Sequence, residues 1–474
     1  MRSSASGVFL HETHLPHPPE VVFAWHERPG ALARLTPALM GRTGSEPSDG
    51  IRDGSVASFA VSLPGMSSLP WVGERLLWPW RARHLGYDPP HSFEDVMESG
   101  PFAAWHHRHA FEPDGQGGTM LTDEVTYAVP GPSVVSSRVR SVVEEQLHRI
   151  FAYRSAQLAA DLDFHATHSV RRTVAVTGAH GLVGRQLVAL LGGGGHEVRR
   201  LVRGAPTGND LRWDPAAGVL DTEDLRDVDV VIHLAGEPIG RRFTPEHKQE
   251  VLHSRTASTA LLASVLGTLA ADGRPRALVV ASAAGWYGAD RGDEVLTEDS
   301  APGDDFLAAV CRAWESAADA ARDAGLRVVH LRTGYVQAAG GGQLALQLPL
   351  YRLGLGGRLG DGRQWMPWIT LDDLVALYAH VALTDTLSGV VNACAPNPVR
   401  AGDYARTLGA VLARPAVLPV PSFGPALLLG RQGARELALA GQRMSADRAL
   451  SWGHRFRHPQ LRGGLEHVLA VRPG

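Results

Sequence analysis

Cysteine and long apolar runs are scarce in this sequence of 474 residues. Both shortages reduce the number of protein classes to which it could belong. The only two cysteines, Cys311 and Cys394, lie far apart, which excludes a disulfide framework and a cysteine-based zinc pattern. Apolar stretches such as 260–271 are well below the roughly 20 residues that span a bilayer. The N-terminus also lacks the apolar core of a signal peptide. We therefore expect a cytoplasmic protein without membrane insertion.

An excess of charge of either sign is lacking as well. The formal net charge is only −3, which gives no electrostatic reason to expect a nucleic acid or an anionic membrane as partner. With 44% hydrophobic and 20% charged residues, the composition is that of a globular protein. The length exceeds what one hydrophobic core normally organises, so two or three domains are expected. We expect the binding partner to be a small molecule.

Residues 1–165 have the texture of an α+β domain. Short apolar runs are broken by Pro and Gly, and the alternation of apolar and polar residues is strand-like in 102–111 and 119–129. Residues 133–165 then carry apolar side chains at helical spacing without Gly or Pro. We predict several antiparallel strands followed by one long helix, and a polar linker over 165–172.

Three histidines within this region, His106, His107 and His109, raise the question of a metal site. On a strand only His107 and His109 share a face, and no carboxylate or cysteine joins them at ligand spacing in the sequence. We therefore interpret them as ordinary surface or cavity histidines and predict no metal site.

From Thr173 onward, strands alternate with helices, which is typical of a doubly wound parallel sheet. The predicted strands are 173–178, 196–203, 227–236, 276–283 and 326–334, with a helix over 181–191. We assign 172–395 to a Rossmann-type α/β domain. The alternation is lost after about residue 390, so 396–474 is expected to form a small, mainly helical C-terminal cap that completes this unit.

A glycine motif lies where the first of these strands meets the helix. Gly178 permits a tight turn, Gly181 lets the backbone approach a pyrophosphate, and Gly184 allows close packing of helix on strand. Strand, motif, helix and second strand follow in the order that a dinucleotide fingerprint requires. A plain structural turn is the alternative.

The end of the second strand bears on the choice of cofactor. Sites that prefer NAD place Asp or Glu there, whereas this chain has Arg203, whose guanidinium suits a 2′-phosphate. We therefore expect NADP rather than NAD, with a merely solvated Arg203 as the alternative.

Several motifs of the second domain resemble those of a known family. GAHGLVG (178–184), DVVIHLAGEPIG (229–240), SAAGWYG (282–288) and LRTGYV (331–336) are similar to the extended short-chain dehydrogenase/reductase superfamily. Long segments, among them 234–259 and 353–374, resemble one branch of it, the "epimerase family protein" group, whose members end in a small domain of unknown function. The resemblance also implies a homodimer, which superfamily members often form.

That resemblance implies a set of cofactor-binding residues. They are Gly178, Gly181, Leu182 and Gly184 at the pyrophosphate, Arg203 at the adenosine ribose, Leu234, Ala235, Gly236 and Glu237 beneath the cofactor with Arg242 nearby, and Gly334 and Tyr335 towards the nicotinamide. An exposed ion pair of Glu237 with Arg242 is the alternative for those two residues.

The N-terminal region resembles a different family, the START-like helix-grip domains related to polyketide cyclases. The resemblance rests on 16–37, 92–111 and the long final helix. It implies a curved antiparallel sheet wrapped around a long helix, with an apolar cavity that binds an apolar small molecule or lipid.

The catalytic pattern of the superfamily is incomplete. No Tyr-x-x-x-Lys pair occurs in the second domain, so the usual general acid is missing. Ser282 and Tyr287 are the candidate catalytic replacements, with the substrate expected near them and Trp368. Cofactor-edge packing of Tyr287, strand capping by Ser282 and core packing by Trp368 are the alternatives. Two functions stay open: an NADP(H)-dependent oxidoreductase or epimerase-like enzyme of unknown substrate, and a catalytically silent NADP-binding sensor or scaffold.

Overall fold

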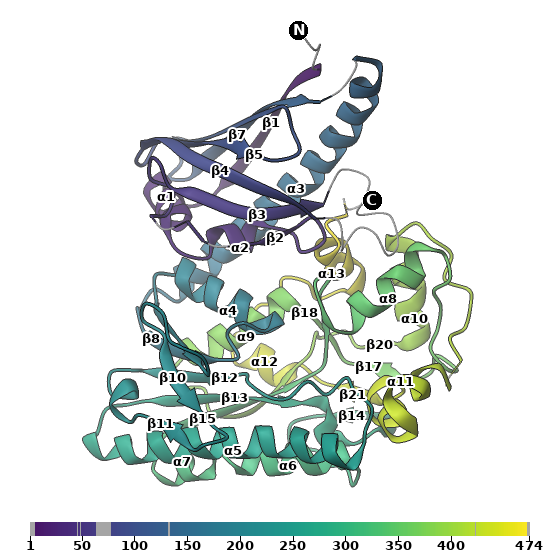
Figure 1. Ribbon diagram of the computed structural model, residues 1–474. Coiled ribbons are helices and arrows are strands. Elements are labelled where there is room, and N and C mark those ends of the chain that lie inside the picture. The colour runs from purple at the N-terminus through teal and green to yellow at the C-terminus, as the bar shows by residue number, and fades with distance from the viewer. Residues whose placement is uncertain are drawn as a thin grey trace. The chain divides into compact units, whose positions relative to one another are not determined.

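The computed structural model describes residues 5–44, 46–47, 49–62, 77–130, 133–421 and 423–471, and Figure 1 traces the chain. These residues form two compact units. The first unit is Met1–Ser169 with two short pieces, Gly192–Gly195 and Glu466–Gly474. The second unit comprises Val170–Leu191 and His196–Leu465.

The first unit contains an antiparallel sheet of seven strands in the order β1-β7-β6-β5-β4-β3-β2. The strands are β1 Ala5–Leu15, β2 Gly41–Thr43, β3 Val56–Ser62, β4 Leu77–Asp88, β5 Ser92–Ser99, β6 Ala104–Pro113 and β7 Thr119–Val129. The helices are α1 Pro19–Glu27, α2 Ala31–Leu35 and α3 Ser133–Thr167. The predicted strand over 119–129 and the predicted long helix are therefore confirmed as β7 and α3.

The long helix α3 packs its apolar stripe on the sheet. Val143, Leu147 and Phe151 are buried together with Phe9 and Val125, since residues four apart on a helix share a face. Val142 also belongs to the apolar pattern of the sequence, but it is 41% exposed because it lies one position off this stripe.

The second unit contains a sheet of eight strands in the order β11-β10-β9-β8-β12-β13-β15-β19. The strands are β8 Thr173–Thr177, β9 Glu197–Val202, β10 Leu211–Asp214, β11 Val219–Leu220, β12 Val230–His233, β13 Ala277–Ala283, β15 Arg327–Thr333 and β19 Gly389–Ala393. All pairings are parallel except that of β10 with β11. The strand order reverses between β8 and β12, so the predicted doubly wound Rossmann-type sheet is confirmed.

Helices cover both faces of this sheet (Figure 1). They are α4 Leu182–Gly193 and α9 Leu371–Leu383 on one face, and α5 Pro245–Leu269, α6 Phe306–Ser316 and α7 Asp319–Asp323 on the other. Strand residues such as Val231 and Leu278 are fully buried against Leu262 and Leu266 of α5. Burial on both faces explains why the central strands of the sequence are continuously apolar rather than alternating.

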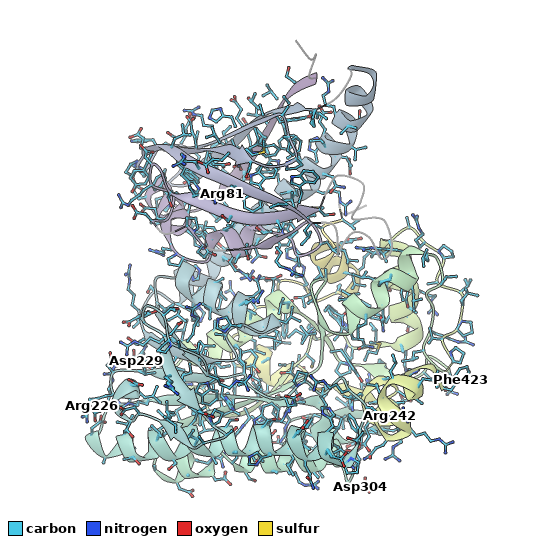
Figure 2. All side chains as sticks on the ribbon, viewed as in Figure 1. Arg81, Arg226, Asp229, Arg242, Asp304 and Phe423 are labelled. Carbon is cyan, nitrogen blue, oxygen red and sulfur yellow. The ribbon has the colours of Figure 1, made fainter. Side chains whose placement is uncertain are left out.

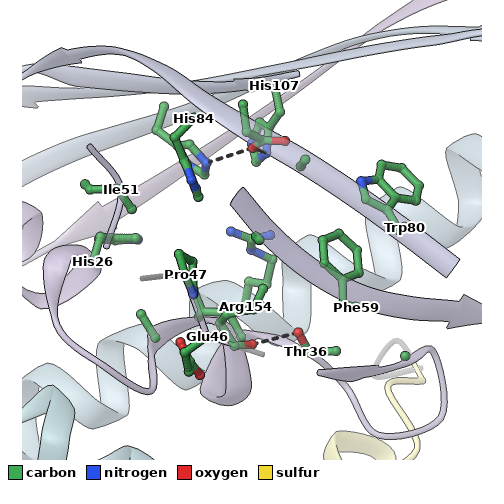
Figure 3. Close-up of a pocket in the computed structure, with 18 of the residues that line it drawn as sticks. His26, Thr36, Glu46, Pro47, Ile51, Phe59, Trp80, His84, His107 and Arg154 are labelled. Atoms are coloured by element: carbon green, nitrogen blue, oxygen red, sulfur yellow. Dashed lines mark hydrogen bonds and ion pairs between the residues drawn. The ribbon is translucent and has the colours of Figure 1, made fainter. Parts of the chain in front are cut away.

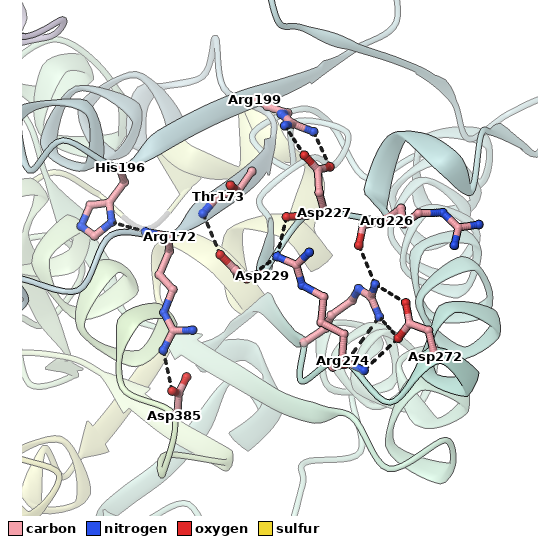
Figure 4. Close-up of polar contacts among 11 residues, drawn as sticks. Arg172, Thr173, His196, Arg199, Arg226, Asp227, Asp229, Asp272, Arg274 and Asp385 are labelled. Atoms are coloured by element: carbon pink, nitrogen blue, oxygen red, sulfur yellow. Dashed lines mark hydrogen bonds and ion pairs between the residues drawn. The ribbon is translucent and has the colours of Figure 1, made fainter.

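Charged side chains tie the amino ends of the strands together (Figure 4). Asp229 accepts from the backbone N–H of Thr173 at 2.8 Å and from Arg274 at 2.7 Å, which joins β8 to β12. Arg276 forms a two-pronged contact with Asp272 at 2.7 and 2.8 Å. This network fixes the sheet at the edge opposite the carboxyl ends, where ligands of such folds bind.

The remaining elements belong to the second unit, except that the last helix crosses the division at residue 466. They are β14 Asp290–Leu296, β16 Tyr335–Gln337, α8 Gly342–Arg352, β17 Trp365–Met366, β18 Trp368–Thr370, β20 Val399–Arg400, α10 Ala401–Val411, α11 Phe423–Gly433, the π-helix η5 Ala434–Ala438, β21 Gly441–Met444, α12 Asp447–Ser451 and α13 Leu461–Val468. The C-terminal part contains α10, α11, α12 and α13, and its strand β21 pairs in parallel with β14. Of the helices described, none has the length and apolarity needed to cross a membrane.

Candidate functional site

The glycine loop between β8 and α4 is shaped by three different constraints. Gly178 has a positive φ of +65°, and a Cβ there would lie 3.0 Å from the backbone nitrogen of Ala235. A Cβ on Gly184 would lie 2.2 Å from the carbonyl oxygen of Gly178, so only glycine lets the helix pack this closely. A Cβ on Gly181 would meet only that same oxygen, at 3.2 Å, and otherwise open space. The backbone at Gly181, just before Leu182 opens α4, is thus free to approach a ligand.

Thr177, the last residue of β8, holds the neighbouring strand end in place. Its buried Oγ1 accepts from the backbone N–H groups of Leu234 and Ala235 at 3.0 and 3.1 Å. The same oxygen lies 2.7 Å from Nδ1 of His233, the last residue of β12. With two bonds accepted, the hydroxyl proton is directed to His233, so Thr177 fixes the backbone at the reversal of strand order.

His233 continues this chain of hydrogen bonds into α5. Its Nε2 lies 2.9 Å from Ser258 Oγ, which in turn donates to the carbonyl of Ser254 at 2.6 Å. Burial, together with the positive charge of Arg255, lowers the pKa of His233 to about 3. The imidazole is therefore neutral, and its hydrogen bonds fix one tautomer. Sequence reasoning did not identify Thr177 and His233 as part of the site. The one feature of the sequence that points to them is that each is a polar residue at the end of an apolar strand.

The segment after β12 is anchored from α5. The backbone N–H of Glu237 donates to Ser254 Oγ at 3.0 Å, and Arg255 donates to the Glu237 carbonyl at 3.0 Å. A Cβ on Gly236 would lie 3.4 Å from the Arg255 guanidinium. The segment Leu234–Glu237 thus lies beside the glycine loop, and its course is set by buried groups.

Glu237 and Arg242 do not pair with each other, so the alternative interpretation of an ion pair between them is wrong. Glu237 pairs instead with Arg241 at 2.9 Å, because both side chains lie on the same side of the turn. Arg242 donates to the carbonyl of Leu427 in α11 at 3.2 Å, and Figure 2 shows it beside that helix. Arg242 therefore connects this loop to the C-terminal part of the unit.

Arg203 directly follows β9 and is exposed. Its neighbour on β10 is a second exposed arginine, Arg212, which is aligned with Val202. Neither side chain makes an ion pair or hydrogen bond to any residue that the structure describes. Two guanidiniums without a described partner therefore lie by the carboxyl end of β9: Arg203 follows that strand, and Arg212 lies beside it on β10. Sequence reasoning missed Arg212.

Gly334 and Tyr335 lie at the carboxyl end of β15. A Cβ on Gly334 would come within 1.9 Å of the Pro367 carbonyl oxygen, so only glycine fits there. The hydroxyl of Tyr335 donates to the carbonyl of Leu437 in η5 at 2.9 Å, and burial raises the pKa of this phenol. Tyr335 therefore ties the sheet to the C-terminal part of the unit.

The candidate catalytic pair lies in a buried network around Arg332. Ser282 donates to Glu315 Oε1 at 2.7 Å, and Glu315 accepts a two-pronged contact from Arg332 at 2.9 and 3.0 Å. Arg332 also reaches the hydroxyl of Tyr287 at 3.3 Å. The structure thus brings Ser282 and Tyr287 together through one guanidinium.

Tyr287 itself has no exposed surface. Its hydroxyl donates to Asn392 Oδ1 at 2.6 Å, and burial raises its pKa to about 12 despite the nearby Arg332. The phenol is therefore protonated at neutral pH. Trp368 is also fully buried and donates its indole N–H to the carbonyl of Asn397 at 2.8 Å, so it packs in the core rather than lining an open pocket.

The first unit contains a cavity of about 350 Å³ (Figure 3). Its apolar wall includes Leu35, Met40, Ile51, Ala57, Phe59, Val61, Trp80, Phe93, Trp105, Leu147, Ile150 and Phe151. Its polar wall includes His26, His84, Asp95, His107, His109 and Arg154. The volume falls in the range of small-molecule sites, and the mixture of a large apolar wall with a few polar groups is typical of them.

Two donors on this wall have no partner in the described chain. The indole N–H of Trp80, a side chain only 5% exposed, makes no hydrogen bond. Arg154 stacks over Phe151, with 5.1 Å from the guanidinium carbon to the ring centre, and makes no ion pair to a described carboxylate. His26, by contrast, donates to the Val22 carbonyl at 2.8 Å, and burial lowers its pKa to about 4, so it is neutral.

Comparison with protein families locates two matches in the second unit. Residues 174–394 match the NAD dependent epimerase/dehydratase family, and 420–468 match a domain of unknown function, DUF1731. The "Epimerase family protein SDR39U1 homolog, chloroplastic" of Arabidopsis thaliana is 38% identical over 307 residues, which covers 63% of this chain and 86% of that protein.

Two solved structures are similar as well. The "nucleoside-diphosphate sugar epimerase" of Corynebacterium glutamicum is 36% identical with a TM-score of 0.78, covering 98% of this chain and 90% of that one. The human epimerase family protein SDR39U1 with NADPH is 34% identical with a TM-score of 0.56, covering 63% of this chain and 99% of that one. The first of these structures therefore has counterparts to both units.

Proposed function

Because the chain belongs to the NAD-dependent epimerase/dehydratase family, in its SDR39U1-like branch with a C-terminal DUF1731 domain, we propose that it binds NADP(H) and acts on a small molecule as an oxidoreductase or epimerase-like enzyme. The observation that carries this proposal is the glycine loop. Its backbone is open at Gly181, while Gly178 and Gly184 are held against their neighbours at the reversal of strand order. This is the cradle that a pyrophosphate requires.

The residues at the pyrophosphate and ribose positions are of the kinds that NADP(H) needs. Gly181 and the N-terminus of α4 would hold the pyrophosphate, and Leu234–Glu237 would line the cofactor beside them. Arg203, joined by Arg212, would pair with the 2′-phosphate, since neither guanidinium has a described partner. The human relative crystallised with NADPH supports this choice over NAD. When bound, the nicotinamide supplies the hydride donor or acceptor.

We propose that Ser282 and Tyr287 act in this site by positioning Arg332 rather than by touching the substrate. Both side chains are buried, Tyr287 contacts Arg332, and Ser282 donates to Glu315, the ion-pair partner of Arg332. These contacts support that role, whereas the direct catalytic role predicted from the sequence would need an exposed hydroxyl. A second candidate function, a silent NADP-binding sensor, is favoured by one observation. The phenol of Tyr287 is committed to Asn392 and has a pKa of about 12.

For the first unit we propose a START-like domain that binds a small apolar molecule. The cavity with its apolar wall, the antiparallel sheet and the long helix α3 support this assignment. Free donors at Trp80 and Arg154 favour a ligand with one anionic end. Cytoplasmic location and a homodimer stay predictions from the sequence.

Calorimetric titration of the full chain with NADPH and NADH tests the main proposal. We expect NADPH to bind and Gly181→Val to abolish binding, because the valine side chain would occupy the open cradle. Gly463→Val, exposed on α13 with nothing within 4 Å of the added Cβ and no positive φ, is the control. Turnover of carbonyl substrates, followed by NADPH absorbance, separates the enzyme from the sensor. Failure of wild type to bind either cofactor would overturn the proposal.

A further inference from the structure

Three potential metal ligands converge at the polar end of the cavity in the first unit. Asp95 lies on β5, directly opposite His107 on β6, and His109 follows two residues later on the same face. Asp95 Oδ2 lies 3.3 Å from Nδ1 of His107 and 3.9 Å from Nε2 of His109. The three ligand atoms all lie within 4.8 Å of one another. Nitrogen and oxygen ligands held at ~2.0–2.2 Å by one metal ion lie ~3 to 3.5 Å apart, so little movement would close this set around an ion.

A fourth buried side chain, Asp123, contacts both imidazoles on the side away from Asp95. Nε2 of His107 donates to Asp123 Oδ1 at 3.0 Å, and Nδ1 of His109 lies 2.7 Å from the same oxygen. Each histidine therefore directs one ring nitrogen to Asp123 on β7 and the other towards Asp95. Metal-binding histidines are commonly oriented in this way, by a carboxylate on the nitrogen that does not bind the metal.

The charges of the cluster also favour a cation. Asp95 and Asp123 are both largely buried, with side-chain exposures of 17% and 6%. Two buried carboxylates are costly unless they are paired. One divalent cation with two neutral imidazoles would balance both negative charges, whereas without a metal ion the balance would need a protonated histidine together with Arg154 on the same wall.

The packing around the histidines keeps them in place. Phe93 stacks on His109 with 4.1 Å between ring centres, and Phe151 meets His107 edge-on at 5.5 Å. Asp95, His107 and His109 all line the cavity, so one side of the cluster faces its interior. A metal held by three protein ligands would thus keep open positions towards a bound molecule.

We propose that Asp95, His107 and His109 bind a divalent first-row transition metal ion, with Asp123 as the carboxylate that orients both histidines. Two histidines and one carboxylate are the ligand set of open, reactive metal sites. The open positions would take an oxygen atom of a small amphipathic anion. Its charge would be shared with Arg154, and its apolar part would lie along the Trp80 wall. The proposed metal centre belongs to the first unit, whereas the glycine loop belongs to the second.

Titration of the metal-free full chain with Co²⁺, followed by its visible absorbance and by calorimetry, tests this proposal. We expect one Co²⁺ per chain, displaced by Zn²⁺. His109→Gln and Asp95→Asn should each weaken binding at least 100-fold, and Asp123→Asn should weaken it ~10- to 100-fold. His106→Gln is the matched control, because His106 lies on the other face of β6 and pairs with Glu94.

Circular dichroism and urea unfolding of each variant establish that it is folded. Asp95→Asn keeps the size of the side chain, so it tests the site even if His109→Gln does not fold. Two results would overturn the proposal. One is wild-type protein that binds no stoichiometric Co²⁺ or Zn²⁺. The other is equal binding by the His106→Gln and Asp95→Asn variants, which would leave the cluster as a protonated histidine between two carboxylates.

Discussion

Thr177 and His233 end adjacent parallel strands at the point where the strand order reverses, with 2.7 Å between Oγ1 and Nδ1. This contact lies beneath the segment that begins at Leu234, whose backbone N–H bonds to the same Thr177 oxygen. The dinucleotide edge of the sheet is therefore held by a side chain that need not touch the ligand. The Thr177 hydroxyl holds the start of this segment, while Ser254 and Arg255 hold its end.

Thr177→Val removes that hydroxyl and keeps the shape of the side chain. The N–H groups of Leu234 and Ala235 lose their acceptor, which costs about 1–3 kcal/mol for buried donors. We expect NADPH affinity to fall roughly 10-fold, measured by calorimetry. Thr268→Val, on the exposed face of α5, is the control and should bind as wild type does. Unchanged affinity of Thr177→Val would show that the segment is held by other contacts.

Arg203→Ser tests the preference for the phosphorylated cofactor. Loss of a charge-assisted hydrogen bond costs about 1.5–3 kcal/mol, so NADPH affinity should fall roughly 10- to 100-fold while NADH affinity stays the same. Arg226→Ser, at the amino edge of the sheet, is the control because its side chain pairs only with Glu223. An equal loss for both cofactors would place Arg203 away from the 2′-phosphate.

The local sequence pattern was sufficient to predict many of the strands and helices and the glycine loop. Contacts between residues far apart in the sequence could not be predicted. The run 119–129 alternates strictly, and β7 occupies Thr119–Val129, because one buried face imposes the period of two. The glycine loop was equally predictable, since turn, close approach and packing each demand glycine at a fixed spacing.

Asp95 shows why the surroundings of the histidine cluster could not be deduced from the sequence. Nothing near His107 and His109 in the sequence supplies a carboxylate, and the strand pairing that sets Asp95 opposite His107 cannot be deduced from periodicity. The same holds for Thr177 and Ser258, which meet His233 from 56 and 25 residues away. Which side chains meet at these sites therefore depends on contacts between elements that are distant in the sequence.

Tyr287→Phe distinguishes a positioning role from a catalytic one. The substitution leaves Asn392 Oδ1 without its donor in the core, so we expect a loss of about 1–3 kcal/mol in the free energy of unfolding, measured with urea. Where turnover is found, its pH profile should keep its shape. Ser282→Ala should be less than additive with Tyr287→Phe, since both act through Arg332. A stable Tyr287→Phe protein with no turnover would instead make Tyr287 catalytic.

Ala57→Phe should fill the cavity of the first unit. Ala57 is 5% exposed on β3 and lines the cavity with Phe59 and Val61, whereas Ala60 lies on the opposite face of the strand. We expect an environment-sensitive apolar dye to fluoresce with wild type and with Ala60→Phe, but not with Ala57→Phe. Dye binding that persists in Ala57→Phe would place the apolar ligand elsewhere.

The burial of His330 makes the stability of the second unit depend on pH. It is 1% exposed on β15, and burial, reinforced by the positive charges of Arg322 and Arg332, lowers its pKa to about 4. The unfolded chain takes up a proton near pH 6.5, while the folded chain does so only near pH 4. Stability is therefore complete above pH 6.5 and falls by about 1.4 kcal/mol per pH unit as the pH drops between those values.

His330→Gln should remove this part of the acid sensitivity, because glutamine has no proton to gain. Urea unfolding at pH 7.5, 6.0 and 5.0 should show a smaller loss of unfolding free energy for His330→Gln than for wild type, by about 2 kcal/mol between pH 7.5 and 5.0. The control is His253→Gln, since His253 is exposed on α5 and should leave the slope unchanged. Equal slopes for His330→Gln and wild type would mean that His330 is protonated within the fold, with its buried charge balanced by the nearby Glu315.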